Sequence, residues 1–505
     1  MKSVFQSNLK LIIFCTLLIS LQTSALGDYT CTYTCTTNPL EEIYPNQNMC
    51  VLLDSIPPAL RNLPYVMYSC SDIYNTNRFG FNKRFNYFPV AIIVPTNEDE
   101  LIYSFQALKQ NNLPFSVRSG GHCFGPGSLS NGYIIDLRNF NQIIPDTNTN
   151  TAYIGVGSHL GDVITALGDI DYAIPTGTCS AVCTGGLALG GGTGYLARKF
   201  GLTCDSIQSI RLLTAQGDII DIDPSTNQDL FWALCGAGAN AYGIVLGFTF
   251  KIYYIPTVSL VSLQWGWDPK QATEIFNTWQ EWVTTLPKSI TTECIFSYRT
   301  GTSRVTINML KVGPKPIHEW KCAFCKFNPT VTNNYQGNYI GAATRIASTP
   351  TPPFSKVKSK FLFKPLSKKG LEVVTQFFTQ LQKDAPDIRM NFFFGSMIGG
   401  AIAEHNPNSS FFPRDAFAYL YQFAYWFHED QSASTISLLN RVYHDLEPYT
   451  SPYSYSNLVD YELGATYLHA YYGDHVKRLI KIKRDYDPTN LFTWKQGIPL
   501  VSPRS

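Results

Sequence analysis

The chain has 505 residues, which exceeds what one hydrophobic core usually holds and favours two or more domains. Apolar residues make up 45% of the sequence and aromatic residues 14%, and this composition excludes a disordered chain. Lys and Arg number 39 against 37 Asp and Glu, a net charge of +2, so the sequence carries no basic footprint for nucleic acid. A weakly charged chain rich in Tyr and Trp suits neutral polar ligands, such as sugars or aromatic alcohols.

Residues 1–25 have the layout of a cleavable signal peptide. Lys2 and Lys10 precede an apolar run from Leu11 to Leu21, and small residues ending at Ala25 follow it. A signal anchor is the alternative, although the apolar run is short for a membrane span. We therefore expect an exported protein, in the secretory lumen or outside the cell, with no membrane attachment after cleavage.

Cysteines are frequent and unevenly spread. An oxidising compartment favours disulfides among them. The N-terminal cysteines are Cys31, Cys35, Cys50 and Cys70, and the sequence leaves their three possible pairings open. Cys322 and Cys325 form a C-x-x-C without a second ligand pair at zinc spacing, so we expect a structural role and no metal site. Asn408 begins a glycosylation sequon.

The elements predicted after the N-terminal lead alternate between strands and helices. Strands are expected at 90–95, 115–118, 133–137, 153–156, 210–222 with a hairpin turn at 216–218, and 243–253, and helices at 97–111 and 162–167. From about residue 254 the pattern of expected elements changes. The expected elements there are a helix within 265–282, strands at 291–310, a proline-rich loop at 349–353, aromatic strands within 390–426 and a basic helix at 474–486. This order indicates an α+β fold whose antiparallel aromatic sheet lines a pocket.

Two glycine-rich segments carry the main chemical signals. Arg118, Ser119, Gly120, Gly121 and His122 follow a predicted strand, and adjacent glycines let backbone N–H groups turn toward a phosphate. An ordinary turn is the alternative for this segment. The second segment, 175–195, lacks the nicotinamide-dinucleotide fingerprint. Its cysteines, Cys179 and Cys183, could be a structural disulfide or buried thiols on this evidence alone.

These motifs, together with 91–101, 229–233 and 486–492, resemble those of the berberine-bridge-enzyme-like FAD-linked oxidases, in the same order over about residues 86–500. The resemblance implies a vanillyl-alcohol-oxidase-type flavin domain in two parts, with a substrate domain inserted between them. The expected boundaries are 1–25 signal peptide, 26–85 cysteine-containing extension, 86–255 FAD-binding domain, 256–465 substrate domain built on an antiparallel sheet backed by helices, and 466–505 returning segment.

The same resemblance implies roles for particular residues. His122 matches the histidine bonded to the flavin 8α-methyl group, and Cys179 matches the cysteine bonded to flavin C6. The other implied cofactor contacts are Arg118, Ser119, Gly120, Gly121, Val182, Gly185, Gly186, Gly243, Ile244 and Tyr472. Val182 stands where the family tends to have valine in oxidases, which predicts dioxygen as the electron acceptor, although core packing would also select valine.

Alcohol oxidation needs a group that accepts the hydroxyl proton as hydride leaves. Tyr455 and Asn457 resemble the family's Tyr-x-Asn-x-x-Asp stretch, so Tyr455 is our first candidate, with a satisfied core tyrosine as the alternative. The alignment of the strand ending at Trp426 places Tyr421, and not Gln422, at the family's Gln/Glu position, with Tyr419 on the same strand face. This departure argues against ring closure driven by a carboxylate base.

From these signals we expect an exported oxidase with bicovalent FAD that oxidises a C–OH group and reduces dioxygen to hydrogen peroxide. A sugar or oligosaccharide converted to its lactone is the expected substrate class, partly by family analogy. An oxidase or dehydrogenase of an aromatic alcohol or secondary metabolite is the alternative, and a non-catalytic secreted flavin- or carbohydrate-binding protein is a second one. The sequence leaves the oligomeric state open.

Overall fold

The structure is a computed structural model that describes residues 56–501, except 62, 69–72, 348–351, 385 and 405. All of them belong to one unit of the chain, Val51–Ser505. The expected signal peptide, the four N-terminal cysteines and most of the proline-rich loop lie outside the described residues. No described helix has the length and apolar character that crossing a membrane requires.

The first sheet has four strands in the order β1-β2-β4-β3, and only β1 is antiparallel to its neighbour. Its strands are β1 Val66–Tyr68, β2 Ala91–Ile93, β3 Phe115–Arg118 and β4 Tyr133–Asp136. Helix α1 (Tyr74–Asn77) precedes β2, and α2 (Glu98–Gln110) connects β2 to β3. The N-terminus of α2 is capped by Asn97, whose side chain accepts the Glu100 N–H at 3.0 Å, and acidic residues fill its first turn.

The second sheet is antiparallel throughout, with five strands in the order β5-β6-β10-β8-β9. Its strands are β5 Ile143–Asp146, β6 Thr151–Gly155, β8 Ile207–Thr214, β9 Ile219–Ile222 and β10 Gly243–Lys251. The helices between these strands are α3 Leu160–Gly168, α4 Thr184–Leu189, α5 Ala197–Phe200 and α6 Gln228–Ala237. A small ribbon pairs β7 (Tyr172–Ala173) with β11 (Tyr253–Tyr254).

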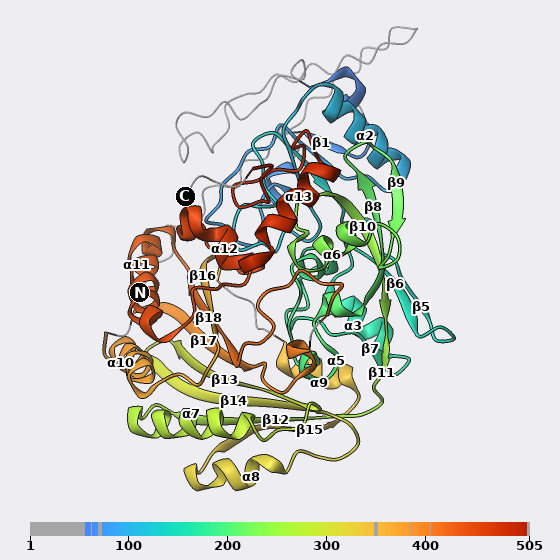
Figure 1. Ribbon diagram of the computed structural model, residues 1–505. Helices are drawn as coiled ribbons and strands as arrows, with labels where there is room; N and C mark the ends of the chain where they lie inside the picture. The colour runs from blue at the N-terminus through green and yellow to red at the C-terminus, as the bar shows by residue number, and fades with distance from the viewer. Residues whose placement is uncertain are drawn as a thin grey trace, which may run out of the picture. The chain divides into compact units, whose positions relative to one another are not determined.

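The third sheet has seven antiparallel strands in the order β15-β12-β14-β13-β17-β18-β16. Its strands are β12 Val258–Gly266, β13 Ile290–Arg299, β14 Thr302–Val312, β15 Thr330–Gly337, β16 Phe354–Leu362, β17 Ile388–Ser396 and β18 Ala418–Trp426. The helices are α7 Pro269–Val283, α8 Glu319–Phe324, α9 Tyr339–Ile346, α10 Lys368–Asp384 and α11 Ser432–Leu446. Helices α7, α10 and α11 pack on the same face of this sheet (Figure 1).

Strand alternation divides this sheet into two chemically different faces. On β18, Leu420, Ala424 and Trp426 join the core under the helices, whereas Tyr419 and Tyr421 join the core of the first two sheets. The second face is therefore turned toward the glycine-rich segments.

The C-terminal segment packs back onto the first half of the chain. Its helices are α12 Tyr467–Tyr472 and α13 Val476–Tyr486, and α13 contacts α6 (Figure 1). Lys483 is fully buried, and its ammonium donates to Asp487 at 2.6 Å and to the carbonyls of Ala241 and Phe492. The chain end is thus joined to the loop before β10.

Arg198 of α5 joins the glycine-rich half of the chain to the seven-stranded sheet. Its fully buried guanidinium donates to the backbone carbonyls of Leu286, Pro287, Ile290 and Ile398. Burial lowers the pKa of Arg198 to about 10. We call this contact the Arg198 clamp. The carbonyls that it binds lie between α7 and the first residue of β13 and just after the end of β17.

The expected α+β fold, with an antiparallel sheet backed by helices, is confirmed. The predicted strands and helices of residues 90–253 recur with end shifts of a few residues. The aromatic region 390–426 is two strands separated by a long loop, because β17 ends at Ser396 and β18 begins at Ala418. The strands β12, β15 and β16 and the helices α8 to α11 were not predicted individually.

Candidate active site

A cavity of about 280 Å³ lies among the loop after β3, the glycine-rich segment and the C-terminal segment. The predicted residues that line it are Ser119, Gly120, Gly121, His122, Val182, Gly185, Gly186, Gly243 and Tyr455. Three glycine-rich or turn segments, far apart in sequence, therefore meet at one hollow.

Glycine is required on these walls for identifiable reasons. A Cβ at Gly120 would lie 2.6 Å from the Cys183 Sγ, and one at Gly185 would lie 2.9 Å from the Val156 Cβ. Gly121 has a φ of +63°, which L side chains rarely adopt. At Gly186 a Cβ would meet nothing within 4 Å, so the missing side chain leaves open space. A cradle of this kind, with bare backbone on its walls, fits the phosphates and ring of a flavin dinucleotide.

The two candidate tether residues lie side by side. The Cys179 Sγ is 3.7 Å from His122 Nε2, although 57 positions separate them in sequence. The ring of Phe81 stacks on His122 with centroids 4.1 Å apart, which fixes the imidazole plane. Burial lowers the pKa of His122 to about 4, so its imidazole is neutral at physiological pH and keeps a free lone pair.

Cys183 differs from Cys179 in its surroundings. It is buried, its thiol donates to the Gly157 carbonyl at 3.2 Å, and burial raises its pKa to about 12. Both cysteines are free thiols, so the alternative of a Cys179–Cys183 disulfide is not what the structure contains. Of the two, Cys179 is the one available beside His122.

Tyr455 presents its hydroxyl oxygen to two hydrogen-bond donors. The Gly192 N–H donates to it at 2.9 Å, and the Asn457 side-chain amide donates at 2.8 Å. Both acceptor positions of the phenol are then in use, and its own proton is free to interact with a molecule in the cavity. Burial raises the pKa of Tyr455, and the two donors act in the opposite direction by favouring the phenolate.

The glycine run before α5 makes this arrangement possible. A Cβ at Gly190 would lie 2.0 Å from the Asn457 Oδ1, so only glycine lets Asn457 approach. Gly192 has a φ of +82°, and this conformation accompanies the bond from its N–H to Tyr455. The glycine run therefore positions the two donors around the Tyr455 hydroxyl group.

Tyr419 and Tyr421 lie in a stack with Tyr455. The rings of Tyr419 and Tyr421 are 4.1 Å apart and nearly parallel, and Tyr421 lies 5.6 Å from Tyr455 at 12°. Thr193, which lines the cavity, is 3.4 Å from the Tyr421 hydroxyl. The stack therefore runs from the sheet to the cavity wall.

Sequence reasoning missed Glu293 of β13. Its carboxylate accepts a hydrogen bond from the Tyr195 hydroxyl at 2.7 Å and another from the Tyr419 hydroxyl. The sequence argument against a carboxylate base considered only the strand that ends at Trp426, and strand pairing brings the carboxylate of Glu293 next to the tyrosine stack from β13. Within the sequence, the only available signal was an acidic residue inside a strand of otherwise apolar and hydroxyl side chains.

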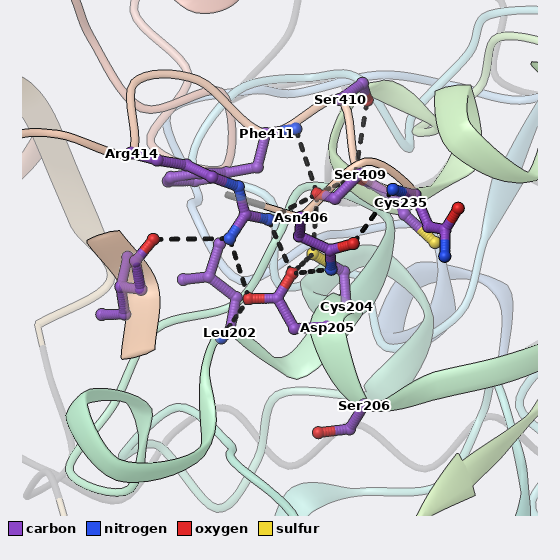
Figure 2. A network of polar contacts seen from close by, with 12 residues as sticks. Leu202, Cys204, Asp205, Ser206, Cys235, Asn406, Ser409, Ser410, Phe411 and Arg414 are labelled. Carbon is purple, nitrogen blue, oxygen red and sulfur yellow. Dashed lines mark hydrogen bonds and ion pairs between the residues drawn. The ribbon is translucent and has the colours of Figure 1, made fainter. Parts of the chain in front are cut away.

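A polar network holds the loop between β17 and β18 against the glycine-rich half (Figure 2). Arg414 forms a bidentate ion pair with Asp205, with bonds of 2.6 and 3.0 Å, and Asn406 donates to the same carboxylate. Arg414 also donates to Ser409, whose hydroxyl donates to the Cys235 carbonyl at 2.7 Å.

The segment fixed in this way carries Phe411 to the site. The Phe411 ring lies 5.8 Å from the Tyr455 ring. A Cβ at Gly191 would lie 2.5 Å from the Phe411 ring, so only glycine leaves room for Phe411 there. The network thus supports one side of Tyr455 from a distance.

Other predicted cofactor contacts lie behind the cavity wall. Arg118 pairs with buried Asp136 at 2.6 Å, and Ile244 is fully buried between Gly243 and Val245, which do line the cavity. Tyr472 is buried in the C-terminal segment and is not a lining residue. Their roles as cofactor contacts stay predictions.

Cys322 and Cys325 are exposed free thiols. They form no disulfide bond and are not part of the core, so the structure does not support the expected structural role. Among the described residues, no three His, Cys, Asp or Glu side chains come together as a metal site would require.

A glycine-walled cradle beside a neutral histidine and a thiol, facing a tyrosine-bearing antiparallel sheet, defines a flavin-binding oxidoreductase. The family comparisons agree: residues 89–223 match the FAD binding domain, and residues 454–499 match the family described as berberine and berberine like. The chain belongs to the berberine-bridge-enzyme-like FAD-linked oxidoreductases.

Relatives and solved structures cover most of the chain. The uncharacterised FAD-linked oxidoreductase YgaK of Bacillus subtilis (strain 168) is 30% identical over 436 residues, covering 84% of this chain and 94% of the relative. The tetrahydroberberine oxidase of Argemone mexicana is 28% identical and covers 82% of this chain and 83% of its own length. Among solved structures, Physcomitrella patens BBE-like 1 has a TM-score of 0.78 at 26% identity, covering 86% of this chain and 97% of its own. The xylooligosaccharide oxidase from Myceliophthora thermophila C1, in complex with xylobiose, has a TM-score of 0.76 at 23% identity, with coverage of 86% and 96%.

Proposed function

We propose that this protein is an exported oxidase with doubly attached FAD that oxidises a C–OH group of a sugar or oligosaccharide and transfers the electrons to dioxygen. The observation that carries the proposal is the pairing of Cys179 at 3.7 Å with His122, which lines a cavity that Tyr455 also lines. Ser119, Gly120, Gly121 and His122 would hold the flavin, which would supply an acceptor for the hydride of the carbon that bears the hydroxyl group and a donor of the two electrons to dioxygen, with hydrogen peroxide as the product.

Two attachments suit the geometry of the two side chains. The neutral imidazole nitrogen would bond to the flavin 8α-methyl carbon and the neighbouring thiol sulfur to flavin C6. Each new bond would replace a C–H bond, with the protons released to solvent and the two electrons passed through the flavin to dioxygen. Phe81 holds the imidazole by stacking, and its backbone N–H donates to the Gly121 carbonyl at 2.8 Å, which holds the loop that carries His122. Ser119, Gly120 and Gly121 would then face the pyrophosphate, and Gly243 the adenine end.

Tyr455 is proposed as the proton acceptor of the reaction. The substrate hydroxyl gives its proton to the phenolate oxygen, which two donors stabilise, as hydride leaves the adjacent carbon. Tyr421 and Tyr419 would support Tyr455 from behind the cavity wall, since their rings stack in series with its ring. Val182 lines the cavity, which supports dioxygen as the electron acceptor.

A sugar is supported by the aromatic, weakly charged site, because ring faces stack on sugars and hydroxyls bind them. The fold itself accommodates xylobiose in the xylooligosaccharide oxidase named above. An aromatic alcohol is the second candidate, since the rings of Phe393 and Phe423 also face this side of the sheet and contact each other at 5.5 Å.

The same proposal includes two predictions from the sequence. The chain divides into domains at residues 86–255, 256–465 and 466–505, and residues 1–25 direct its export. The return of α13 to α6 and the span of the seven-stranded sheet support the division. Cleavage of the leader is testable by sequencing the N-terminus of the secreted protein.

The test of the attachments is retention of flavin by the acid-denatured chain. We expect FAD mass and absorbance to stay with the wild type, with His122→Ala and with Cys179→Ala, and to be released from the double variant. Cys183→Ala is the matched control and should behave as the wild type. Release of flavin from the wild-type chain would contradict covalent attachment.

The substrate class is tested by anaerobic flavin bleaching and by peroxide release. Mono- and oligosaccharides with a free anomeric carbon should bleach the flavin and release hydrogen peroxide in air, whereas aromatic alcohols should not. Turnover of only aromatic alcohols would select the second candidate. Absence of bleaching by every compound of both panels would favour the non-catalytic binding protein.

A further inference from the structure

Glu293, Gly395 and Tyr419 form one row across three adjacent strands. Glu293 of β13 pairs with Gly395 of β17, and Gly395 pairs with Tyr419 of β18. A Cβ at Gly395 would lie only 1.9 Å from the Tyr419 Cζ, so the tyrosine ring lies over the bare backbone of the middle strand. This crossing lets the Tyr419 hydroxyl reach a carboxylate two strands away.

The Glu293 carboxylate accepts two phenolic protons. One oxygen accepts from Tyr419, and the other accepts from Tyr195, which belongs to the segment between the glycine run and α5. Asn308 stands opposite Glu293 on β14 and hydrogen-bonds with Tyr195. Burial raises the pKa of Glu293, and the bonds from Tyr419 and Tyr195 act to lower it.

The environments at the two ends of the tyrosine stack are opposite in kind. Tyr419 donates its proton to a carboxylate, which favours the neutral phenol, whereas the Tyr455 oxygen accepts from Gly192 and Asn457, which favours the phenolate. Burial and then the charge of Glu293 raise the pKa of Tyr419. Environments that separate the proton affinities of neighbouring groups mark different roles in catalysis.

We propose that Glu293 is a positioning residue that decides which tyrosine of the stack loses its proton: it keeps Tyr419 as a neutral donor by accepting its hydrogen bond, and leaves Tyr455 to ionise. Burial raises the pKa of Tyr421, and the charge of Glu293 acts in the same direction, which disfavours ionisation of Tyr421. The inference rests on the proposed function, because it assigns the proton acceptor of that same reaction. The other titratable groups that face the stack are Tyr195 and Tyr339 near Glu293 and Cys204 near Tyr455.

The first test needs no substrate. A fluorinated tyrosine, with a more acidic phenol, is incorporated at position 419 or at position 455 of the flavin-loaded protein, and ¹⁹F NMR follows each ionisation with pH. We expect position 455 to ionise at lower pH than position 419. Glu293→Gln should lower the pH at which position 419 ionises by at least about two pH units. Coulomb's law at an effective dielectric constant near 20 already gives this shift for charges roughly 5–6 Å apart, and the Tyr419 hydroxyl is in direct hydrogen-bond contact with the carboxylate.

In the same experiment, Glu293→Gln should move position 455 by only about one pH unit, clearly less than position 419, because ring spacings of 4.1 and 5.6 Å separate Tyr455 from Tyr419 along the stack. The control is Glu281→Gln, which removes an exposed carboxylate from α7. It should leave the ionisation of both positions unchanged. Equal shifts at both positions, or no shift at 419, would overturn the proposal.

The second test uses anaerobic flavin reduction by the active sugar. Tyr455→Phe should remove the basic limb of the pH–rate profile. Glu293→Gln and Tyr419→Phe should each slow reduction about tenfold without moving that limb, and the double variant should be no slower than either. If the rate losses of Glu293→Gln and Tyr419→Phe multiply in the double variant, and the melting temperature falls in parallel, Glu293 has only a structural role.

The two tests separate two kinds of failure. If no compound reduces the flavin, the proposed function fails, while the NMR titration still decides the role of Glu293. If reduction proceeds and position 419 does not respond to Glu293→Gln, only the present inference fails.

Discussion

Removing the Asn457 amide should displace the pH dependence of the reaction by a calculable amount. Asn457 donates to the Tyr455 oxygen at 2.8 Å, and a hydrogen bond to a charged group contributes about 1.5–3 kcal/mol. Since one pKa unit corresponds to about 1.4 kcal/mol, Asn457→Ala should raise the pKa of Tyr455 by about one to two units. Burial already raises this pKa in the wild type, so the two effects add in the same direction.

The assay is the rate of anaerobic flavin reduction between pH 5 and the alkaline limit of stability. Because only the phenolate accepts a proton, reduction at neutral pH should be about ten- to a hundredfold slower in Asn457→Ala, and the two profiles should converge at high pH. Asn457 also donates to the Leu187 carbonyl at 3.0 Å, so the melting temperature is measured in parallel.

Asn333→Ala is a matched control, since Asn333 donates to the Ser262 hydroxyl on the outer strands of the sheet. It should leave the profile in place. A basic limb that stays at the wild-type pH in Asn457→Ala would refute the assignment of Tyr455 as the ionising group.

Two further predictions concern packing and stability. Gly395→Ala should displace the Tyr419 ring, because the new Cβ would lie 1.9 Å from it, and slow flavin reduction at least about tenfold; Gly266→Ala on β12, where a Cβ meets nothing within 4 Å, should not. Equal rates in the two variants would contradict the crossing described for this row. Asp487→Ala leaves the buried Lys483 charge unpaired and should cost about 3–5 kcal/mol in urea unfolding, whereas Asp485→Ala, which breaks an exposed pair on the same helix, should change little. A small effect of Asp487→Ala would mean that the backbone carbonyls alone satisfy Lys483.

Local signals predicted the parts of the site that lie within one stretch of sequence. The glycines before His122 were visible as one contiguous motif, whereas Tyr455 and Asn457 were expected from their resemblance to the family's Tyr-x-Asn-x-x-Asp stretch. Alternation along β18 also placed Tyr419 and Tyr421 on one face, as the structure has them. These elements depend on local backbone geometry, which residue type largely determines.

Glu293 could not be found in this way, because its contact with Tyr419 depends on the order and register of β13, β17 and β18. Lys356, Lys358 and Lys360 present the same difficulty. Their alternation along β16 is typical of a solvent-facing edge, yet all three are buried. Asp460, which arrives from the C-terminal segment a hundred residues later, accepts hydrogen bonds from Lys356 and Lys358.

The Arg198 clamp has an implication for which side chains around it can change. Its guanidinium recognises only main-chain carbonyls, at Leu286, Pro287, Ile290 and Ile398, and therefore places no demand on the side chains at those positions. Side chains at these four positions can therefore change while the hydrogen bonds of the joint remain intact. A single arginine thus joins the seven-stranded sheet to the glycine-rich half of this chain through main-chain recognition alone.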